Sequence, residues 1–177
     1  GPGLQHPRPC PGRRLRVTRA VWRIATDAPA YEADDMTGTG AKLTGGRWNE
    51  RDVAVVYAAE HRSLACLETM AHLNAGGLPL NRYLVEVTIP DEIWKAREEH
   101  DAASLPVGWD ARPSSRTSIG WGTTWLRSRR TAVLVVPSVI VPEERNVIIN
   151  PHHPDSAGIT ARKQRLWTYD PRLAKAP

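Results

Sequence analysis

The chain has 177 residues, of which 41% are hydrophobic, and its formal net charge is +5. This length predicts a single domain with a sizeable core, and no apolar run approaches the roughly 18 residues that a membrane-spanning helix needs. The sequence shows no secretory signal. Its two cysteines, Cys10 and Cys66, are too few for a disulfide framework and lack metal-ligand spacing, so we expect a cytoplasmic protein.

The basic charge is concentrated at the amino-terminal end. Residues 1–19 hold five of the 24 basic residues and no acidic residue, and the other 19 basic residues balance the 19 acidic ones. Four prolines lie in the same stretch, so we expect a disordered basic leader or a tail left by protein expression. A single domain is predicted over residues 20–173, followed by a tail over residues 174–177. A basic leader can contact nucleic acid, but the predicted domain is close to neutral.

The first predicted strand covers residues 21–25. Trp22 and Ile24 alternate with Arg23, which is typical of a half-buried strand that turns Arg23 either toward solvent or into a cleft. Residues 26–46 are expected to form a polar loop, whose glycines allow a ligand to approach the backbone closely.

The segment Gly45-Gly46-Arg47-Trp48-Asn49 closes this loop. A guanidinium beside open backbone is suited to bind a pyrophosphate or a carboxylate, so Arg47 and Gly46 are candidate binding residues. A surface salt bridge of Arg47 is the plainer alternative. The glycine spacing matches no phosphate-binding loop and no dinucleotide-binding fingerprint, so by itself it is weak support.

Residues 53–57 form a continuous apolar run, which predicts a strand buried on both faces. Tyr57 ends this run at the expected rim of the sheet, where its ring can stack on a planar ligand. The alternative is a tyrosine that only packs in the core. The next predicted helix begins at an N-cap, Ser63, and ends near Leu73.

Glu68 is the most informative residue of this helix. The apolar side of the helix is predicted to comprise Leu64, Leu67, Glu68 and Ala71. A carboxylate in such a place needs a partner, because burying an unpaired charge is costly, and functional sites use perturbed acids of this kind. The alternative is a buried ion pair with an arginine that serves packing alone. We expect Arg47, Tyr57 and Glu68 to converge on one pocket.

The remaining elements complete an α+β pattern with mixed or antiparallel central sheets and flanking helices. Strands are predicted over residues 83–89, 132–136, 139–141, 146–150 and 159–169, with a helix from Ser114 or Ser115 to about Arg130. Residues 91–113 are expected to be irregular, with Trp94 and Trp109 as packing anchors. The pair His152-His153 has no second ligand pair at suitable spacing, so no metal is expected.

Three stretches together resemble the RES-domain toxins of bacterial type II toxin–antitoxin pairs, a family named for an arginine, a glutamate and a serine. They are residues 40–49, Val56-Tyr57-Ala58 with Leu67-Glu68, and Val136-Pro137-Ser138 with Glu144, Asn146 and residues 150–155. The resemblance covers about residues 21–173. It implies an ADP-ribosyltransferase-like fold that binds and consumes NAD as a substrate.

The resemblance implies that Arg47, Glu68 and Ser138 are the residues of the family name. Cleavage of the bond between nicotinamide and ribose passes through an oxocarbenium-like state, and Glu68 would stabilise its charge and grip a ribose hydroxyl. Tyr57 would stack on the nicotinamide, and Ser138 would orient it by hydrogen bonding.

Further residues are expected to bind NAD. Arg47, together with Arg23, would hold the pyrophosphate or a ribose. Gly46 and Asn146 complete the expected binding set. No metal and no covalent nucleophile are required by this chemistry.

Three functions follow in order of preference. The first is a toxin that consumes NAD as a glycohydrolase or by phosphorolysis, and the second is a protein-modifying ADP-ribosyltransferase with the same pocket. The third is a non-catalytic nucleic-acid-binding module, which should lose binding when residues 1–19 are removed. The resemblance also implies a partner, a small antitoxin with a helix-turn-helix DNA-binding domain; neither membrane association nor direct nucleic-acid binding is expected.

Overall fold

The computed structural model describes residues 17–73 and 77–173. The tail predicted over residues 174–177 and most of the predicted leader, including Cys10, lie outside these ranges. Thr18 and Arg19, the last two residues of the predicted leader, belong to the first strand. Within the described ranges, no helix is long and apolar enough to cross a membrane.

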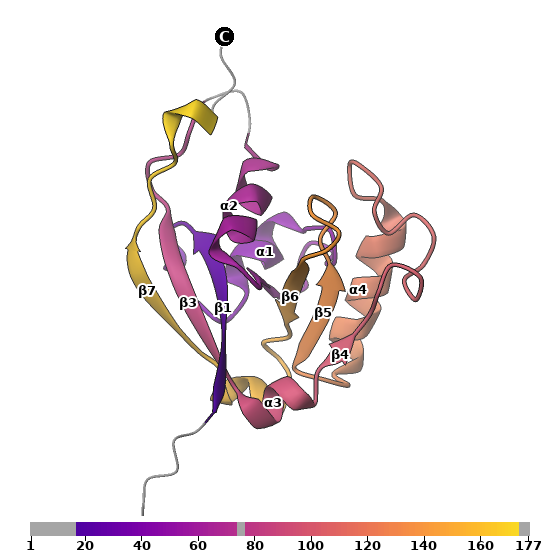
Figure 1. Cartoon of the computed structure of the whole chain (residues 1–177). Coiled ribbons are helices and arrows are strands. Elements are labelled where there is room, and N and C mark those ends of the chain that lie inside the picture. The colour runs from indigo at the N-terminus through magenta and orange to yellow at the C-terminus, as the bar shows by residue number, and fades with distance from the viewer. Residues whose placement is uncertain (1–16, 74–76, 174–177) are drawn as a thin grey trace, which may run out of the picture.

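Seven strands of the described chain form one sheet, in the order β4-β5-β6-β2-β1-β3-β7. They are β1 (Thr18–Ala25), β2 (Val56–Ala59), β3 (Tyr83–Pro90), β4 (Glu98–Glu99), β5 (Val133–Pro137), β6 (Arg145–Ile149) and β7 (Thr160–Leu166). Neighbouring strands are antiparallel except β4 and β5, which are parallel. This mixed sheet with its flanking helices confirms the predicted α+β class (Figure 1).

Helices flank this sheet. Those of the described ranges are α1 (Thr39–Thr44), α2 (Arg62–Met70), α3 (Asp91–Lys95) and α4 (Arg116–Ser128), with 3-10 turns η1 (Pro154–Gly158) and η2 (Pro171–Leu173). Figure 1 shows α4 beside β4 and β5, and α2 near the middle of the molecule. Ser115 caps α4, as one of the two predicted caps, and its Oγ accepts a hydrogen bond from the Thr117 amide at 3.3 Å.

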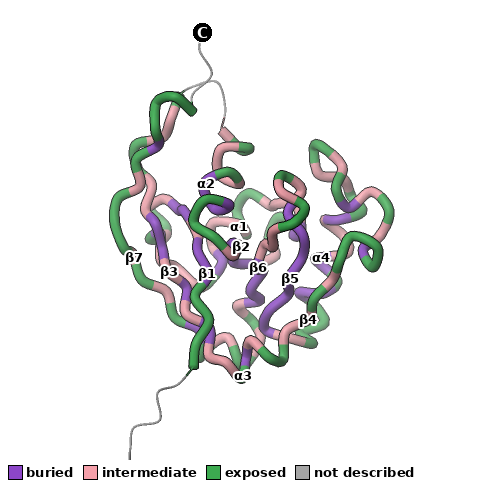
Figure 2. The backbone as a smooth tube through the Cα atoms, viewed as in Figure 1, coloured by how far each residue is buried: buried purple, intermediate pink, exposed green. Residues whose placement is uncertain are grey.

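The two faces of the sheet bury different clusters of side chains. One face carries a core that includes Val21, Val56, Val85, Val133 and Val147. The opposite face is covered in two places, because α4 packs on β5 and β6 and α2 packs on β1 and β3. The boundary between these two covered regions runs along β2, where Tyr57 packs against the α4 cluster and Ala59 belongs to the α2 cluster. Figure 2 shows the buried strands between exposed outer segments.

The strands around the site differ from prediction in coverage and position. β1 is buried on both faces, since Val21 joins the core and Trp22 joins the α2 cluster; β1 lies inside the sheet and is covered from both sides. β2 begins at Val56, three residues later than predicted, and runs to Ala59. Tyr57 therefore lies within β2, opposite Ile148, and the prediction that it ends a strand is wrong.

The helix that carries Glu68 also differs from prediction. His61 occupies the N-cap position of α2, so Ser63 lies in the first turn and is not the cap. Leu67 is exposed, whereas the buried residues of α2 are Leu64, Ala65 and Cys66. The packed side of α2 is thus rotated from the predicted one, and Glu68 lies at its edge, half-buried.

Three short elements were not predicted from the sequence. α1 lies within the predicted loop 26–46, and α3 and β4 lie within the segment 91–113 that we expected to be irregular. Each has six residues or fewer, which is too short for a periodic pattern to emerge. Residues 139–141 form no strand, and β7 is shorter at both ends than residues 159–169. Trp109 is buried, as expected of a packing anchor, and Trp94 is half-buried.

Candidate active site

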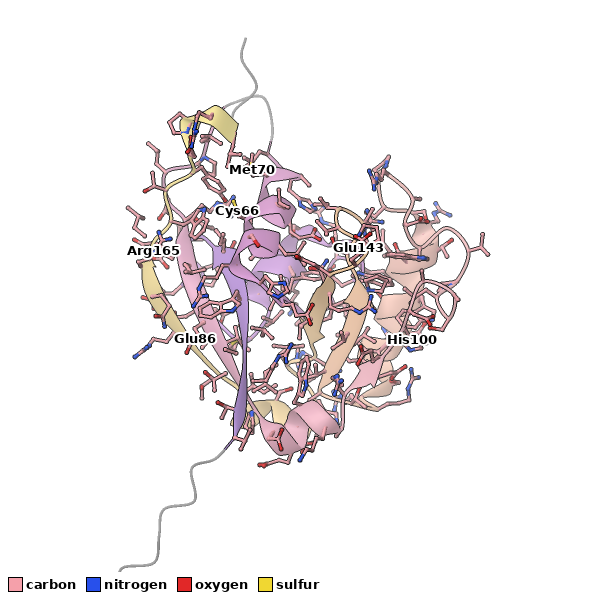
Figure 3. All side chains as sticks on the ribbon, viewed as in Figure 1. Cys66, Met70, Glu86, His100, Glu143 and Arg165 are labelled. Atoms are coloured by element: carbon pink, nitrogen blue, oxygen red, sulfur yellow. The ribbon has the colours of Figure 1, made fainter. Side chains whose placement is uncertain are left out.

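The candidate site lies on the face of the sheet where the α2 and α4 clusters meet. Val56 and Ala58 point into the core, so Tyr57, which alternates with them, projects from the opposite face. Asn146 pairs with Ala59 in the register of β6 and β2, and it projects from the same face as Tyr57. In Figure 3, Cys66 and Met70 mark α2 and Glu143 marks the loop after β5, the two segments that bring Glu68 and Ser138 together.

Glu68 is half-buried in the last turn of α2, and one of its carboxylate oxygens is fixed. Oε1 accepts a hydrogen bond from Ser138 Oγ at 2.8 Å and another from Asn146 Nδ2 at 2.7 Å. Within the described ranges, Oε2 has no hydrogen-bond partner and the carboxylate forms no salt bridge. The carboxylate is therefore oriented by neutral donors and keeps one oxygen available to a ligand.

Ser138 is fully buried, and its hydroxyl uses its whole bonding capacity inside the protein. Its Oγ accepts the amides of Ile140 at 3.0 Å and Val141 at 3.1 Å while it donates to Glu68. A hydroxyl has one donor and two acceptor sites, so all three are occupied. Ser138 thus connects the turn after β5 to Glu68, and its oxygen has no site left for a ligand.

The segment that contains Arg47 forms a tight turn. The Gly46 amide donates to the Asn49 carbonyl at 3.1 Å, and the Asn49 amide donates back to the Gly46 carbonyl at 3.4 Å. Arg47 and Trp48 occupy the corner of this turn. Trp48 is buried and its ring stacks on that of Trp109 at 6.1 Å between centroids, which anchors the turn in the α4 cluster.

Tyr57 is held by the same turn. Its hydroxyl donates to Asn49 Oδ1 at 2.6 Å and accepts the Trp48 amide at 3.0 Å. Burial raises the pKa of the Tyr57 hydroxyl, against the opposing influence of the Trp48 amide and of Arg47, so the group stays neutral at physiological pH. A Cβ atom on Gly46 would lie 2.9 Å from the Tyr57 hydroxyl and 2.9 Å from Asn49 Oδ1. Glycine at position 46 therefore permits this close packing.

Arg47 reaches from the turn to a loop that precedes α4. Its Nη1 donates to the carbonyl oxygens of Trp109 at 3.0 Å and Ala111 at 2.9 Å. Burial lowers the pKa of the Arg47 guanidinium, and the nearby charges of Glu68 and Asp110 oppose this shift. Among the described residues, Nε and Nη2 have no hydrogen-bond partner, so one edge of the guanidinium is available to an anion.

The structure does not bring Arg23 into this group. Arg23 alternates with Trp22 and Ile24, which pack under α2, so it projects from the core face of the sheet, opposite Tyr57. Its Nη1 donates to the Asp35 carbonyl at 3.2 Å. Burial lowers the pKa of the Arg23 guanidinium, and the charge of Asp35 is the main opposing influence.

The histidine pair is also separate from the site. His152 lines two surface cavities of about 310 and 590 Å³, neither of which is lined by Arg47, Tyr57 or Glu68. The described residues contain no cluster of three or more His, Cys, Asp or Glu side chains that could hold a metal ion.

Two supporting residues were not recognised as such from the sequence. Asn49 is buried and donates through Nδ2 to the carbonyls of Ala41, Glu50 and Val53, which fixes the oxygen that orients Tyr57. Gly122 lies where a Cβ atom would collide with the carbonyl of Trp48, so α4 can pack directly on the turn. A close approach between distant segments leaves no local pattern, so the sequence alone offers no signal for this role of Gly122.

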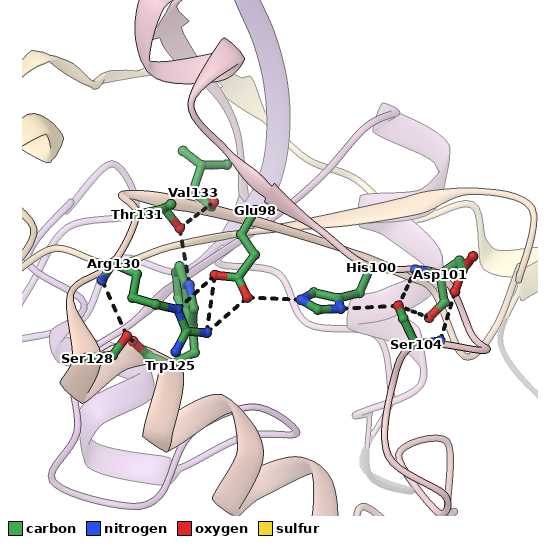
Figure 4. Close-up of polar contacts among 9 residues, drawn as sticks. All are labelled: Glu98, His100, Asp101, Ser104, Trp125, Ser128, Arg130, Thr131 and Val133. Carbon is green, nitrogen blue, oxygen red and sulfur yellow. Dashed lines mark hydrogen bonds and ion pairs between the residues drawn. The ribbon is translucent and has the colours of Figure 1, made fainter.

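A second polar cluster, drawn in Figure 4, joins β4 to the end of α4. His100 lies between Glu98, at 2.9 Å from Nε2, and Ser104, at 3.1 Å from Nδ1. This row has the composition of a hydrolytic triad, but Ser104 Oγ is engaged with the backbone of Asp101 through its amide and its carbonyl, each at 3.1 Å. Arg130 binds both oxygens of Glu98, so the cluster is saturated internally and serves as a structural clamp.

The fold and the site define an α+β protein with a half-fixed carboxylate, a guanidinium and a tyrosine on one face of its sheet. Residues 20–171 match the RES domain family, and the chain belongs to that family. It is 63% identical over 159 residues to a protein named Prs ADP-ribosylating toxin from Sphingobium sp. (strain YBL2). The aligned residues make up 90% of this chain and 99% of the relative.

More distant relatives carry the family name itself. A protein named Toxin Res from Yersinia enterocolitica is 35% identical over 144 residues, which is 81% of this chain and 93% of the relative. A protein named Toxin Res from Photorhabdus laumondii is 37% identical over 147 residues, with 82% and 92% covered. The resemblance that the motifs indicated is therefore confirmed.

Proposed function

We propose that this chain is a toxin that binds NAD and cleaves the bond between nicotinamide and ribose. The observation that carries the proposal is the carboxylate of Glu68, whose Oε1 is held by two neutral donors while Oε2 has no partner among the described residues. The family match and the name of the Sphingobium relative, an ADP-ribosylating toxin, support the same chemistry.

The reaction breaks a carbon–nitrogen bond, and the electron pair of that bond leaves with neutral nicotinamide. Positive charge then develops on the ribose, and the fixed negative charge of Glu68 stabilises it without reorganising. In this proposal Oε2 accepts a hydrogen bond from a ribose hydroxyl, as carboxylates do in glycoside cleavage. The available edge of Arg47 suits the pyrophosphate, and the ring of Tyr57 suits the nicotinamide.

We assign Ser138 a role different from the one expected from the sequence. Its hydroxyl is saturated by Glu68 and by two backbone amides, so we assign it to the orientation of Glu68 and not to contact with nicotinamide. Asn146 shares this role, because its amide is the second donor to the same oxygen. Both are positioning residues in this proposal.

The acceptor of the ADP-ribosyl group distinguishes two candidates. Water or phosphate as acceptor gives the glycohydrolase or phosphorolytic activity that the sequence analysis preferred. The name of the 63% identical relative, which contains "ADP-ribosylating", favours transfer to another molecule such as a protein. Relatives named as toxins also support a cognate antitoxin as partner, for which a helix-turn-helix DNA-binding domain and a cytoplasmic setting are expected.

The decisive experiment measures nicotinamide release from NAD by the purified protein, with and without inorganic phosphate and with and without a cell extract. We expect release by the parent and a fall of at least about 100-fold in Glu68→Ala, because a preorganised charge is lost. Dependence on phosphate or on extract identifies the acceptor, and label transfer from NAD to a protein band identifies the transferase.

Thermal unfolding of both proteins provides the control for folding. No release by folded parent protein under any of these conditions would refute the proposal. If Glu68→Ala releases as much nicotinamide as the parent, the protein still cleaves NAD, but Glu68 has no part in the reaction. Nucleic-acid binding without nicotinamide release would favour the non-catalytic module.

A further inference from the structure

The site as described holds one cation, Arg47, for a ligand whose pyrophosphate carries two negative charges. Arg23, the second cation expected from the sequence, projects from the other face of the sheet. A pyrophosphate bound by proteins is commonly met by more than one charged or backbone donor. The loop before α4 supplies a candidate for the missing cation.

Arg112 lies next to the residue that binds Arg47. Arg47 Nη1 donates to the Ala111 carbonyl at 2.9 Å, and Arg112 is the following residue in the chain. Arg112 is exposed, and its positive charge is one of the influences that lower the pKa of Arg47, after burial, which is the largest. The charges of the two guanidinium groups therefore influence each other, and Arg47 is bonded to the residue before Arg112, although 65 positions separate the two arginines.

Arg112 is also tied to the other side of the site. Its Nη2 donates to the Val139 carbonyl at 2.6 Å, and Val139 directly follows Ser138, which orients Glu68. A continuous path of contacts thus runs from Arg47 through the loop before α4 and Arg112 to the turn that holds Glu68. This single bond uses one of the five N–H donors of the guanidinium, and no other hydrogen bond of Arg112 occurs within the described ranges.

We propose that Arg112 and Arg47 together form a clamp for the pyrophosphate of NAD, with Arg112 as a binding residue that the motifs did not reveal. The inference rests on the proposed function and adds the second half of its anion site. Two like charges held side by side repel each other, and a bridging dianion relieves this repulsion. The bond to Val139 limits the freedom of the Arg112 side chain, so less ordering is needed when the anion binds.

A matched set of variants tests this assignment. Arg112→Ala removes the proposed contact, and Arg112→Lys keeps the charge but not the planar guanidinium. Arg116→Ala is the control, because Arg116 is an exposed arginine of the same segment with no hydrogen bond or ion pair among the described residues. Binding of ADP-ribose, measured by calorimetry, reports the pyrophosphate contact without requiring turnover.

We expect Arg112→Ala to weaken ADP-ribose binding about tenfold to 100-fold, Arg112→Lys to restore part of the loss, and Arg116→Ala to change it less than about twofold. For NAD cleavage, KM should rise in Arg112→Ala while kcat changes little. All variants should unfold at temperatures close to the parent, since the mutated side chains are exposed.

Two outcomes would overturn the assignment. Parent-like binding of ADP-ribose by Arg112→Ala would show that Arg112 makes no contact with the pyrophosphate. A fall in kcat with unchanged binding would show that Arg112 acts only as a strap that steadies Ser138. Failure of the proposed function is distinguishable, because the parent protein itself would then neither bind ADP-ribose nor release nicotinamide.

Discussion

Two glutamates of this protein are held by their neighbours in different ways. Glu98 has both oxygens occupied, by Arg130 and by His100, in a clamp between β4 and α4. Glu68 has one oxygen held by Ser138 and Asn146, and its other oxygen has no partner in the described part of the chain. Glu98 is thus bonded within the protein through both oxygens, whereas Glu68 is oriented by neutral donors on one oxygen and keeps the other oxygen available.

The environments of the two glutamates suit different roles. A salt bridge at Glu68 would have to be broken before the carboxylate could act on a substrate, and that would add to the barrier of the reaction. Neutral donors fix the geometry without neutralising the charge. The charge of Glu68 influences the pKa of Arg47, but Nη1 of Arg47 donates its hydrogen bonds to the carbonyls of Trp109 and Ala111.

The largest effect is expected from Glu68→Gln. The amide oxygen can still accept from Ser138 and Asn146, so the local geometry is kept while the charge is lost. We expect nicotinamide release to fall by about 100-fold to 1,000-fold, with a change of less than about 1 kcal/mol in the free energy of unfolding. Steady-state kinetics and urea denaturation provide the two measurements; a variant that unfolds easily would mean that Glu68 is structural, as Glu98 is.

A smaller effect on cleavage, but a larger effect on the free energy of unfolding, is expected from Ser138→Ala. This change removes one of the two donors to Glu68 and leaves the amides of Ile140 and Val141 without their acceptor. We expect a loss of about 1–3 kcal/mol in the free energy of unfolding and about a tenfold fall in kcat, with KM for NAD nearly unchanged. A large rise in KM without a fall in kcat would instead indicate direct contact between Ser138 and the ligand.

The smallest effect is expected from Glu98→Gln, and it should fall on stability alone. Burial raises the pKa of Glu98, but hydrogen bonds from Arg130 and His100 outweigh it and leave the pKa below its usual value. A lowered folded-state pKa gives stability that is present above the unfolded value of about 4.3 and is lost as the pH falls through the folded value. We expect a loss of roughly 1 kcal/mol at pH 7, because the pair is partly solvated.

This loss should shrink as the pH is lowered below about 4.3, since the parent then loses the same interaction. Denaturation at a series of pH values measures it, and NAD cleavage at pH 7 should stay within about twofold of the parent. A large loss of cleavage in Glu98→Gln would show that the clamp reaches the site through His100 and Trp121, whose rings meet edge to face at 5.0 Å.

The sequence by itself indicated the family and the α+β class, both of which are confirmed, and it supplied the residues of the candidate site. Period-two alternation placed β3, and a continuous apolar run placed β5, because these strands lie in the sheet interior and leave a clear hydrophobic signal. The resemblance rested on residue types and their order along the chain, which can be read directly from the sequence. These residues are the Gly-Gly-Arg-Trp-Asn segment, Tyr57, Glu68 and Ser138. Short elements such as α1, α3 and β4 left no such signal.

Only the tertiary structure decided how these residues act together. Contacts between distant segments decide three features of the site. They set the face of β1 from which Arg23 projects, they fix one oxygen of Glu68, and they occupy all hydrogen-bonding sites of the Ser138 hydroxyl. The same holds for Arg112, which lies 65 positions from Arg47 yet beside it in space. Local patterns report which side chains are buried, but the partner of a polar group depends on how the sheet brings separate loops together, and that is set by the packing of the whole chain.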